Sequence, residues 1–98
     1  MIVDGFDWDE GNTEKCRKHG VSLTEIEEVF CNNPAVLLNQ NHESEEIRYH
    51  AVGRSNKGRY IFVVFTYRIK DGLRLIRPIS ARYMHRKEIE HYERQKRT

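Results

Sequence analysis

The sequence predicts a small α+β domain, because helical spacing dominates its first third and strand-like spacing dominates the part that follows. Apolar residues recur three and four positions apart up to residue 30, whereas residues 46–51 alternate and residues 59–68 are almost wholly apolar. With 98 residues and 38% apolar content, the chain can bury one modest core. We therefore predict one domain over residues 1–98, with two N-terminal helices, about four strands and a C-terminal helix.

Capping signals indicate where the first two helices begin and end. An aspartate at position 7 or 9 can cap a helix that runs through about Lys18, and Gly20 is placed to end it. Ser22 and Glu25 form a capping box, in which each side chain binds a free amide at the start of a second helix. The apolar stripe of that helix comprises Ile26, Val29 and Phe30. We expect the second helix to end near residues 32–34.

The remaining chain has the character of strands. Ala35–Leu38 is a short apolar run, and polar and apolar residues alternate from Glu46 to Ala51 as in a half-buried strand. Arg59–Arg68 suits a central strand covered on both faces. After a turn at Asp71-Gly72, Leu73–Ala81 returns as its hairpin partner.

Two further features concern the C-terminal part. Pro78 cannot donate to a strand ladder, so its strand is expected to lie at an edge or to carry a bulge there. Residues 84–96 predict a charged helix, and Met84, Ile89 and Tyr92 are expected to pack on the sheet.

Charge is sorted along the chain. Residues 1–46 hold eleven acidic and three basic residues, a net charge of −8, whereas residues 47–98 hold four acidic and fourteen basic residues, a net charge of +10. A basic half suits a surface for phosphates or for an acidic partner. The acidic half could equally neutralise it within the molecule.

Several classes of protein are disfavoured. The first residues are acidic where a signal peptide needs a positive end, and no apolar stretch approaches the about 20 residues of a membrane span. Cys16 and Cys31 are too few for a disulfide framework and match no metal-ligand spacing. We expect a cytoplasmic protein with no metal, no cofactor and no membrane contact.

The chain also lacks a phosphate-binding glycine loop, a nucleophile elbow, a CxxC and an HExxH. Among enzymes this favours a reaction that needs no cofactor, such as cleavage of RNA by its own 2′-hydroxyl. That reaction requires a base for the 2′ proton, cations for the charge on phosphorus, and an acid for the departing 5′ oxygen.

Histidines and arginines can fill these roles, and each has a structural alternative. His19 is the first candidate for proton transfer, although Lys18 and His19 could equally stabilise a helix end. Arg48 and His50 share a strand face that a solvated, salt-bridged surface would also explain. Arg68 ends one strand and Arg82 the next, just after Ser80. We expect these two guanidiniums to converge at a strand-end rim and hold a phosphate.

An ordered set of motifs resembles the BrnT toxin family over almost the whole chain. The motifs are FDWDEGNTEKCRKHGVSLTEIEEVF at residues 6–30, His42 with EIRY at 46–49, Gly53-Arg54, FVVFTYR at 62–68 and ISARYMHRKEIEHYE at 79–93. Two positions depart from the family pattern, because Cys16 stands where an asparagine is usual and Pro78 where isoleucine or valine is usual.

The resemblance implies a RelE-like fold with a mainly antiparallel sheet. It also implies a type II toxin that cleaves RNA without a metal and arrests growth. The implied partner is a BrnA-like ribbon-helix-helix antitoxin, with DNA contacted only through the complex and a toxin homodimer within a heterotetramer.

By motif, the expected catalytic residues are His19, Arg68 and Arg82, and the expected substrate-binding residues are Lys18, Arg48 and Ser80. The alternative is a non-catalytic basic module that binds RNA or an acidic protein.

Overall fold

A computed structural model describes residues 3–39 and 46–96 of the chain, which form five strands and three helices. In order they are β1 (Gly5–Phe6), α1 (Glu10–Arg17), α2 (Leu23–Cys31), β2 (Ala35–Asn39), β3 (Arg48–Arg54), β4 (Tyr60–Lys70), β5 (Leu73–Tyr83) and α3 (Arg86–Lys96). The α+β class is confirmed, and β1 is an additional strand. Among the described residues, no helix is long and apolar enough to span a membrane.

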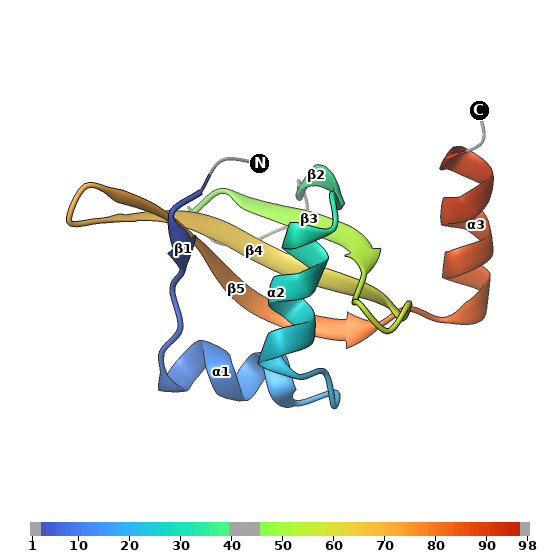
Figure 1. Ribbon diagram of the computed structural model, residues 1–98, viewed down its shortest axis with the longest axis horizontal. Coiled ribbons are helices and arrows are strands. Elements are labelled where there is room, and N and C mark those ends of the chain that lie inside the picture. The colour runs from blue at the N-terminus through green and yellow to red at the C-terminus, as the bar shows by residue number, and fades with distance from the viewer. Residues whose placement is uncertain (1–2, 40–45, 97–98) are drawn as a thin grey trace.

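The strands form one sheet in the order β1-β5-β4-β3-β2, with β4 at its centre as predicted (Figure 1). Neighbouring strands are antiparallel except for β1 and β5, which pair in parallel through Gly5 with Leu75 and Phe6 with Ile76. Asp71 and Gly72 have φ of 52° and 78°, as a two-residue type I′ hairpin requires. The predicted hairpin is therefore confirmed.

Side-chain caps begin the first two helices at predicted residues, but of the predicted Ser22–Glu25 capping box only the Ser22 half forms, because the Glu25 carboxylate accepts from the Ser22 and Tyr83 hydroxyls. Asp9 caps α1, and its carboxylate accepts a hydrogen bond from the Asn12 amide at 3.1 Å. Ser22 caps α2 and accepts from the Glu25 amide at 3.1 Å. The Asn12 side chain is buried and donates to the Pro78 carbonyl at 2.8 Å, which ties α1 to β5.

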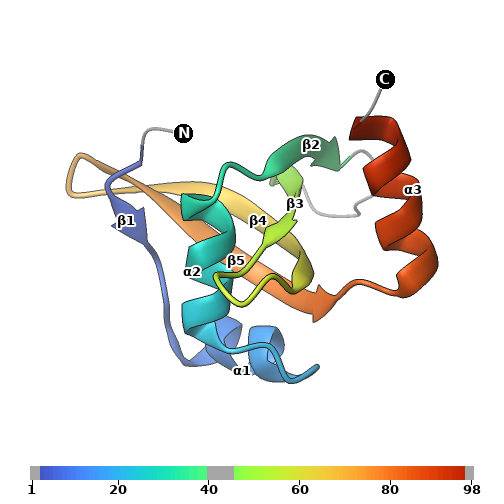
Figure 2. The same ribbon diagram turned by 45° about the vertical axis from the view of Figure 1, so that its right-hand side comes forward.

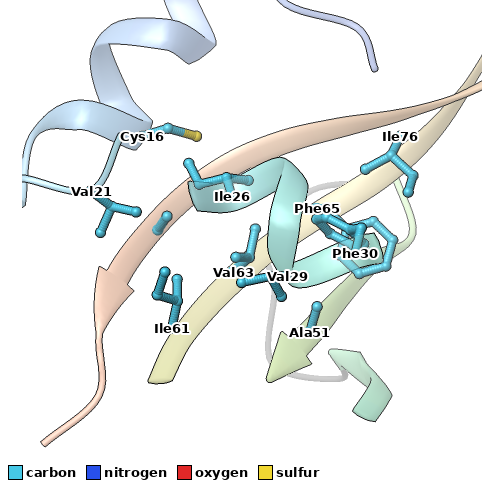
Figure 3. Packing of buried hydrophobic residues seen from close by; sticks show 11 residues of the cluster. Cys16, Val21, Ile26, Val29, Phe30, Ala51, Ile61, Val63, Phe65 and Ile76 are labelled. Atoms are coloured by element: carbon cyan, nitrogen blue, oxygen red, sulfur yellow. The ribbon is translucent and has the colours of Figure 1, made fainter. Parts of the chain in front are cut away.

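The hydrophobic core lies between one face of the sheet and helices α1 and α2 (Figure 3). The predicted stripe of α2, namely Ile26, Val29 and Phe30, is buried against it. The rings of Phe30 and Phe65 meet edge to face with centroids 4.9 Å apart. Burial of side chains of this size contributes roughly 1.5–3 kcal/mol each, so this face holds most of the stabilising contact.

Strand β5 carries a bulge at Ile79. Val64 pairs with Ser80 and Phe65 with Pro78, so Ile79 is the extra residue between them. On either side of the bulge, Arg77 pairs with Thr66 and Arg82 with Phe62. The bulge predicted from Pro78 is confirmed, and it changes the alternation of side chains along β5.

The opposite face of the sheet is only partly covered, which corrects the prediction that β4 is covered on both faces. Helix α3 stands beside one end of the sheet and has no buried residue (Figure 2). Its Tyr92 contacts the ring of Tyr60, with centroids 5.8 Å apart, but Ile89 is only half-buried. Since α3 does not lie on the sheet, Phe62 and Val64 on this face are only half-buried, although Thr66 is buried.

Candidate functional site

We call the face of the sheet turned away from α2 the open face. Strand pairing assigns alternate residues to it, because successive side chains of a strand point to opposite sides. They are Arg48, His50 and Val52 of β3, Phe62, Val64, Thr66 and Arg68 of β4, and Arg77, Ser80 and Arg82 of β5. The open face therefore brings arginines from three strands onto one surface.

Arg82 is held by two parallel hydrogen bonds to a carboxylate of α3. Its Nη1 and Nη2 donate to the two carboxylate oxygens of Glu88 in α3, both at 2.8 Å. The same carboxylate accepts from the His85 amide at 2.8 Å. The hydrogen bonds from Arg82 and His85 lower the pKa of Glu88 to about 2, and Glu88 in turn raises the pKa of Arg82. The pair is fully charged at neutral pH.

His50 and Arg82 contact the same aromatic ring from the two strands that flank β4. The Phe62 ring has its centroid 4.7 Å from that of His50 and 4.8 Å from the Arg82 Cζ. His50 pairs with Val64, and Val64 with Ser80, so His50 and Ser80 flank one residue of β4. Burial lowers the pKa of the His50 imidazole below its ordinary 6.5. A neutral imidazole beside an arginine can accept a proton.

Lys18 and His19 lie in the turn after α1, and both are exposed. In both views this turn is near the C-terminal end of β5, where Arg82 lies (Figures 1 and 2). Within residues 3–39 and 46–96, no hydrogen bond, ion pair or ring contact involves the His19 side chain. The turn that carries His19 is thus at the same end of β5 as Arg82, with the imidazole exposed.

Arg68 and Arg82 do not converge, which corrects the sequence expectation. Arg82 pairs with Phe62, and Arg68 is six residues further along the same strand, about 20 Å away at the rise of a β-strand. In antiparallel strands the C-terminal ends point to opposite ends of the sheet. Two residues that each end a strand of one hairpin therefore cannot meet.

Arg68 instead belongs to a second group of cations, around a hollow of about 270 Å³. The hollow is lined by Gly11, Asn12 and Lys15 of α1, Glu46, Arg48 and Arg68, and Arg77 and Ile79 of β5. We call it the basic hollow. Of the six predicted site residues, Arg48 and Arg68 lie here, Ser80 lies two positions from Arg82 on β5, and Lys18 and His19 lie in the turn after α1.

Two residues of the arrangement were not predicted as site residues. Glu88 is one charge among many in a polar helix, and its contact with Arg82 depends on where α3 stands. The sequence indicates only a strand face for His50, and its sharing of the Phe62 ring with Arg82 depends on the sheet order. His42 lies outside the described residues. Over the described ranges, no cluster of three His, Cys, Asp or Glu could hold a metal ion.

This fold and site define a small α+β protein that presents arginines and a neutral imidazole on an open sheet face, a surface suited to phosphate esters. Residues 8–88 match the family described as ribonuclease toxin, BrnT, of type II toxin-antitoxin system. The match spans well over half of the chain, so the protein belongs to this family, and the resemblance is confirmed. A search of curated proteins found no match.

Proposed function

We propose that this ribonuclease toxin cleaves RNA without a metal ion at the Arg82 end of its open face, and that cleavage in the cytoplasm arrests growth. The ribonuclease and toxin assignments follow from the family. The observation that carries the proposed site is the contact of Phe62 with both His50 and Arg82. This contact places a proton acceptor, His50, and a guanidinium with two donor nitrogens, Arg82, on the same face of the sheet.

The attacking group is the 2′-hydroxyl of the RNA itself. Its oxygen forms a bond to phosphorus while its proton passes to a ring nitrogen of His50. The bond from phosphorus to the 5′ oxygen breaks, and His19 protonates that leaving oxygen. The products are a 2′,3′-cyclic phosphate and a 5′-hydroxyl end. No atom or electron is required from a cofactor.

Arg82 stabilises the charge that grows on the phosphate during this reaction. A guanidinium that already holds a carboxylate with two parallel hydrogen bonds has the geometry to hold two phosphate oxygens. When phosphate binds, it replaces the Glu88 carboxylate as the hydrogen-bond partner of the Arg82 guanidinium. Ser80 and Lys18 contribute further hydrogen bonds to the substrate, and Arg48 with Arg68 contacts its backbone further away.

We also propose a BrnA-like ribbon-helix-helix antitoxin that neutralises the toxin and carries all contact with DNA, in a heterotetramer with two toxin copies. An apolar groove of about 690 Å³ between α3 and the open face supports such a partner. Phe62 and Tyr92 line it together with Leu37, whose surface is 65% exposed. A folded partner would cover these side chains.

The test uses the purified protein, freed of antitoxin, with end-labelled RNA in excess EDTA. The wild type should cleave and leave cyclic phosphate ends. Arg82→Ala should reduce the rate about 10²–10³-fold, the usual effect of removing one transition-state donor. Arg74→Ala is the matched control, because Arg74 lies on the same strand and pairs with Ile69, away from the open face.

Cleavage that needs an added metal, or an equal loss in both variants, would contradict the proposal. A folded wild type that binds RNA without cutting it would indicate the non-catalytic module instead. Thermal unfolding of each variant controls for loss of structure.

A further inference from the structure

We infer that the basic hollow is a second phosphate-binding subsite, which makes single-stranded RNA of several nucleotides the preferred substrate. This inference rests on the proposed cleavage at Arg82. The two sites lie on one face, but they are built from different residues and different strand ends.

The hollow collects cations from four separate elements. Arg48 comes from β3, Arg68 from β4 and Arg77 from β5, and Lys15 of α1 closes the fourth side. The volume of about 270 Å³ is ample for one phosphate group. Convergence from four elements fixes the cations more firmly than a run along one helix would.

Within residues 3–39 and 46–96, carboxylates pair with only part of this charge. Arg68 pairs with Glu46 at 3.0 Å, and Arg77 pairs with Asp7 at 3.3 Å and with Asp9 at 2.9 Å. Asp7 also accepts from Lys70 at 2.9 Å. With Arg48 and Lys15, these six groups make four cations around the hollow and Lys70 beside it, against three carboxylates among the described residues.

Arg48 provides the most direct evidence that the basic hollow binds an anion. In the part of the chain that the structure describes, its Nε is buried without a hydrogen-bond partner, and no ion pair involves its guanidinium. An unpaired donor of a charged group is costly when it is buried, and such groups are rare in folded proteins. A phosphate in the hollow would offset that cost by placing negative charge beside the guanidinium.

The distance between the two sites determines the length of the substrate. Arg77 and Arg82 pair with Thr66 and Phe62, four residues apart on β4 and so about 13 Å, and Arg68 extends this to about 20 Å. Val64 lies between them on the open face and is half-buried. A dinucleotide bound at Arg82 cannot reach the hollow, whereas a longer single strand can follow β4 into it.

The experiment compares kcat/KM for a dinucleotide with that for an oligonucleotide of about eight nucleotides, a typical single-strand site size. We expect Lys15→Ala and Arg68→Ala each to lower the ratio of the long to the short substrate about tenfold, as loss of a charged hydrogen bond would. Lys57→Ala in the exposed β3–β4 turn is the control and should preserve the ratio. A ratio unchanged in both hollow variants would overturn the inference.

A second measurement does not depend on cleavage. Binding of a 2′-O-methyl oligonucleotide, which lacks the attacking hydroxyl, is titrated against salt. Each hollow variant should reduce the slope of log K against log salt by about 0.7, the value for one phosphate contact in a single strand. An unchanged slope would overturn the hollow as a phosphate subsite.

The two measurements separate the possible failures. If the wild type cuts no RNA but the hollow variants weaken binding and lower the salt slope, cleavage at Arg82 is wrong and the subsite stands. If cleavage occurs and an acidic peptide, not the oligonucleotide, loses affinity in the variants, the hollow serves a protein and the inference is wrong.

Discussion

The two faces of β4 differ in what their side chains contact, although they belong to the same eleven residues. On the covered face, Ile61, Val63 and Phe65 are fully buried in a cluster of apolar side chains. On the open face, Phe62 and Val64 are half-buried and Arg68 is exposed. One face therefore supplies stability and the other supplies cations, so substitutions on the two faces should separate folding from activity.

The largest expected effect is on the covered face. Phe65→Ala removes a ring that contacts Phe30 and Tyr49, and should lower the free energy of unfolding by about 3–5 kcal/mol. Phe62→Ala, on the half-buried side, should cost about 1–2 kcal/mol. Urea denaturation measures both. Equal losses would mean that α3 and the open face contribute as much stability as the core.

A substitution on the open face should instead lower the rate of cleavage and leave stability almost unchanged. His50→Gln should reduce kcat about 10²-fold, the lower end for loss of a general base, with little change in the unfolding midpoint. Because the pKa of His50 lies below 6.5, the wild-type rate should remain high until the pH falls below that value. Rate profiles from pH 5 to 8 test this. A variant that loses stability but keeps its rate per folded molecule would assign His50 to structure.

Substitutions at two glycines should have smaller effects on stability, of opposite sign. A Cβ at Gly53 would lie 3.2 Å from Val29 and 3.3 Å from Pro34, so Gly53→Ala should destabilise the protein by about 1–2 kcal/mol. Gly11 lies in α1, where alanine is the better helix former and the nearest atom is 3.4 Å away. Gly11→Ala should stabilise by about 0.5–1 kcal/mol. The same sign of change in both variants would contradict the assignment of close packing at Gly53 and open space at Gly11.

The smallest effect concerns the pair of Arg82 and Glu88. The folded pKa of Glu88, about 2, lies below its ordinary 4.5, so the pair stabilises the fold above pH 4.5 and is lost as the pH falls toward 2. Since both side chains are about one-third exposed, the gain should stay below about 1 kcal/mol. Unfolding of Glu88→Gln and wild type should therefore differ at pH 6 and coincide at pH 2. A constant difference would assign the loss to another contact.

Local chemistry explains why most of the fold could be predicted from the sequence. The Asp9 and Ser22 caps, the stripe of α2 and the Asp71-Gly72 turn all depend on residues within a few positions of each other. Strand β1 has only two residues and pairs with a partner seventy positions away, so no local signal marks it.

The site was less predictable because it depends on contacts between distant elements. The motifs identified Arg82 and Ser80, and both lie on the open face. The spacing of Arg68 and Arg82 suggested one phosphate site, whereas the antiparallel pairing separates them. His50 and Glu88 meet Phe62 and Arg82 only because of the sheet order and the position of α3.

The extra residue at Ile79 also determines which kinds of sequence change this surface can tolerate. In an unbroken strand, residues 77 and 82 would point to opposite sides, and they share the open face only because one residue is inserted between them. Deletion of Ile79 would remove the bulge and still leave Arg82 on the open face and Ala81 in the core, because residues 77 and 82 would then be four positions apart in a regular strand. The loss of this one codon would therefore keep both arginines on one surface, whereas a regular strand that kept all its residues would turn one of them toward the core.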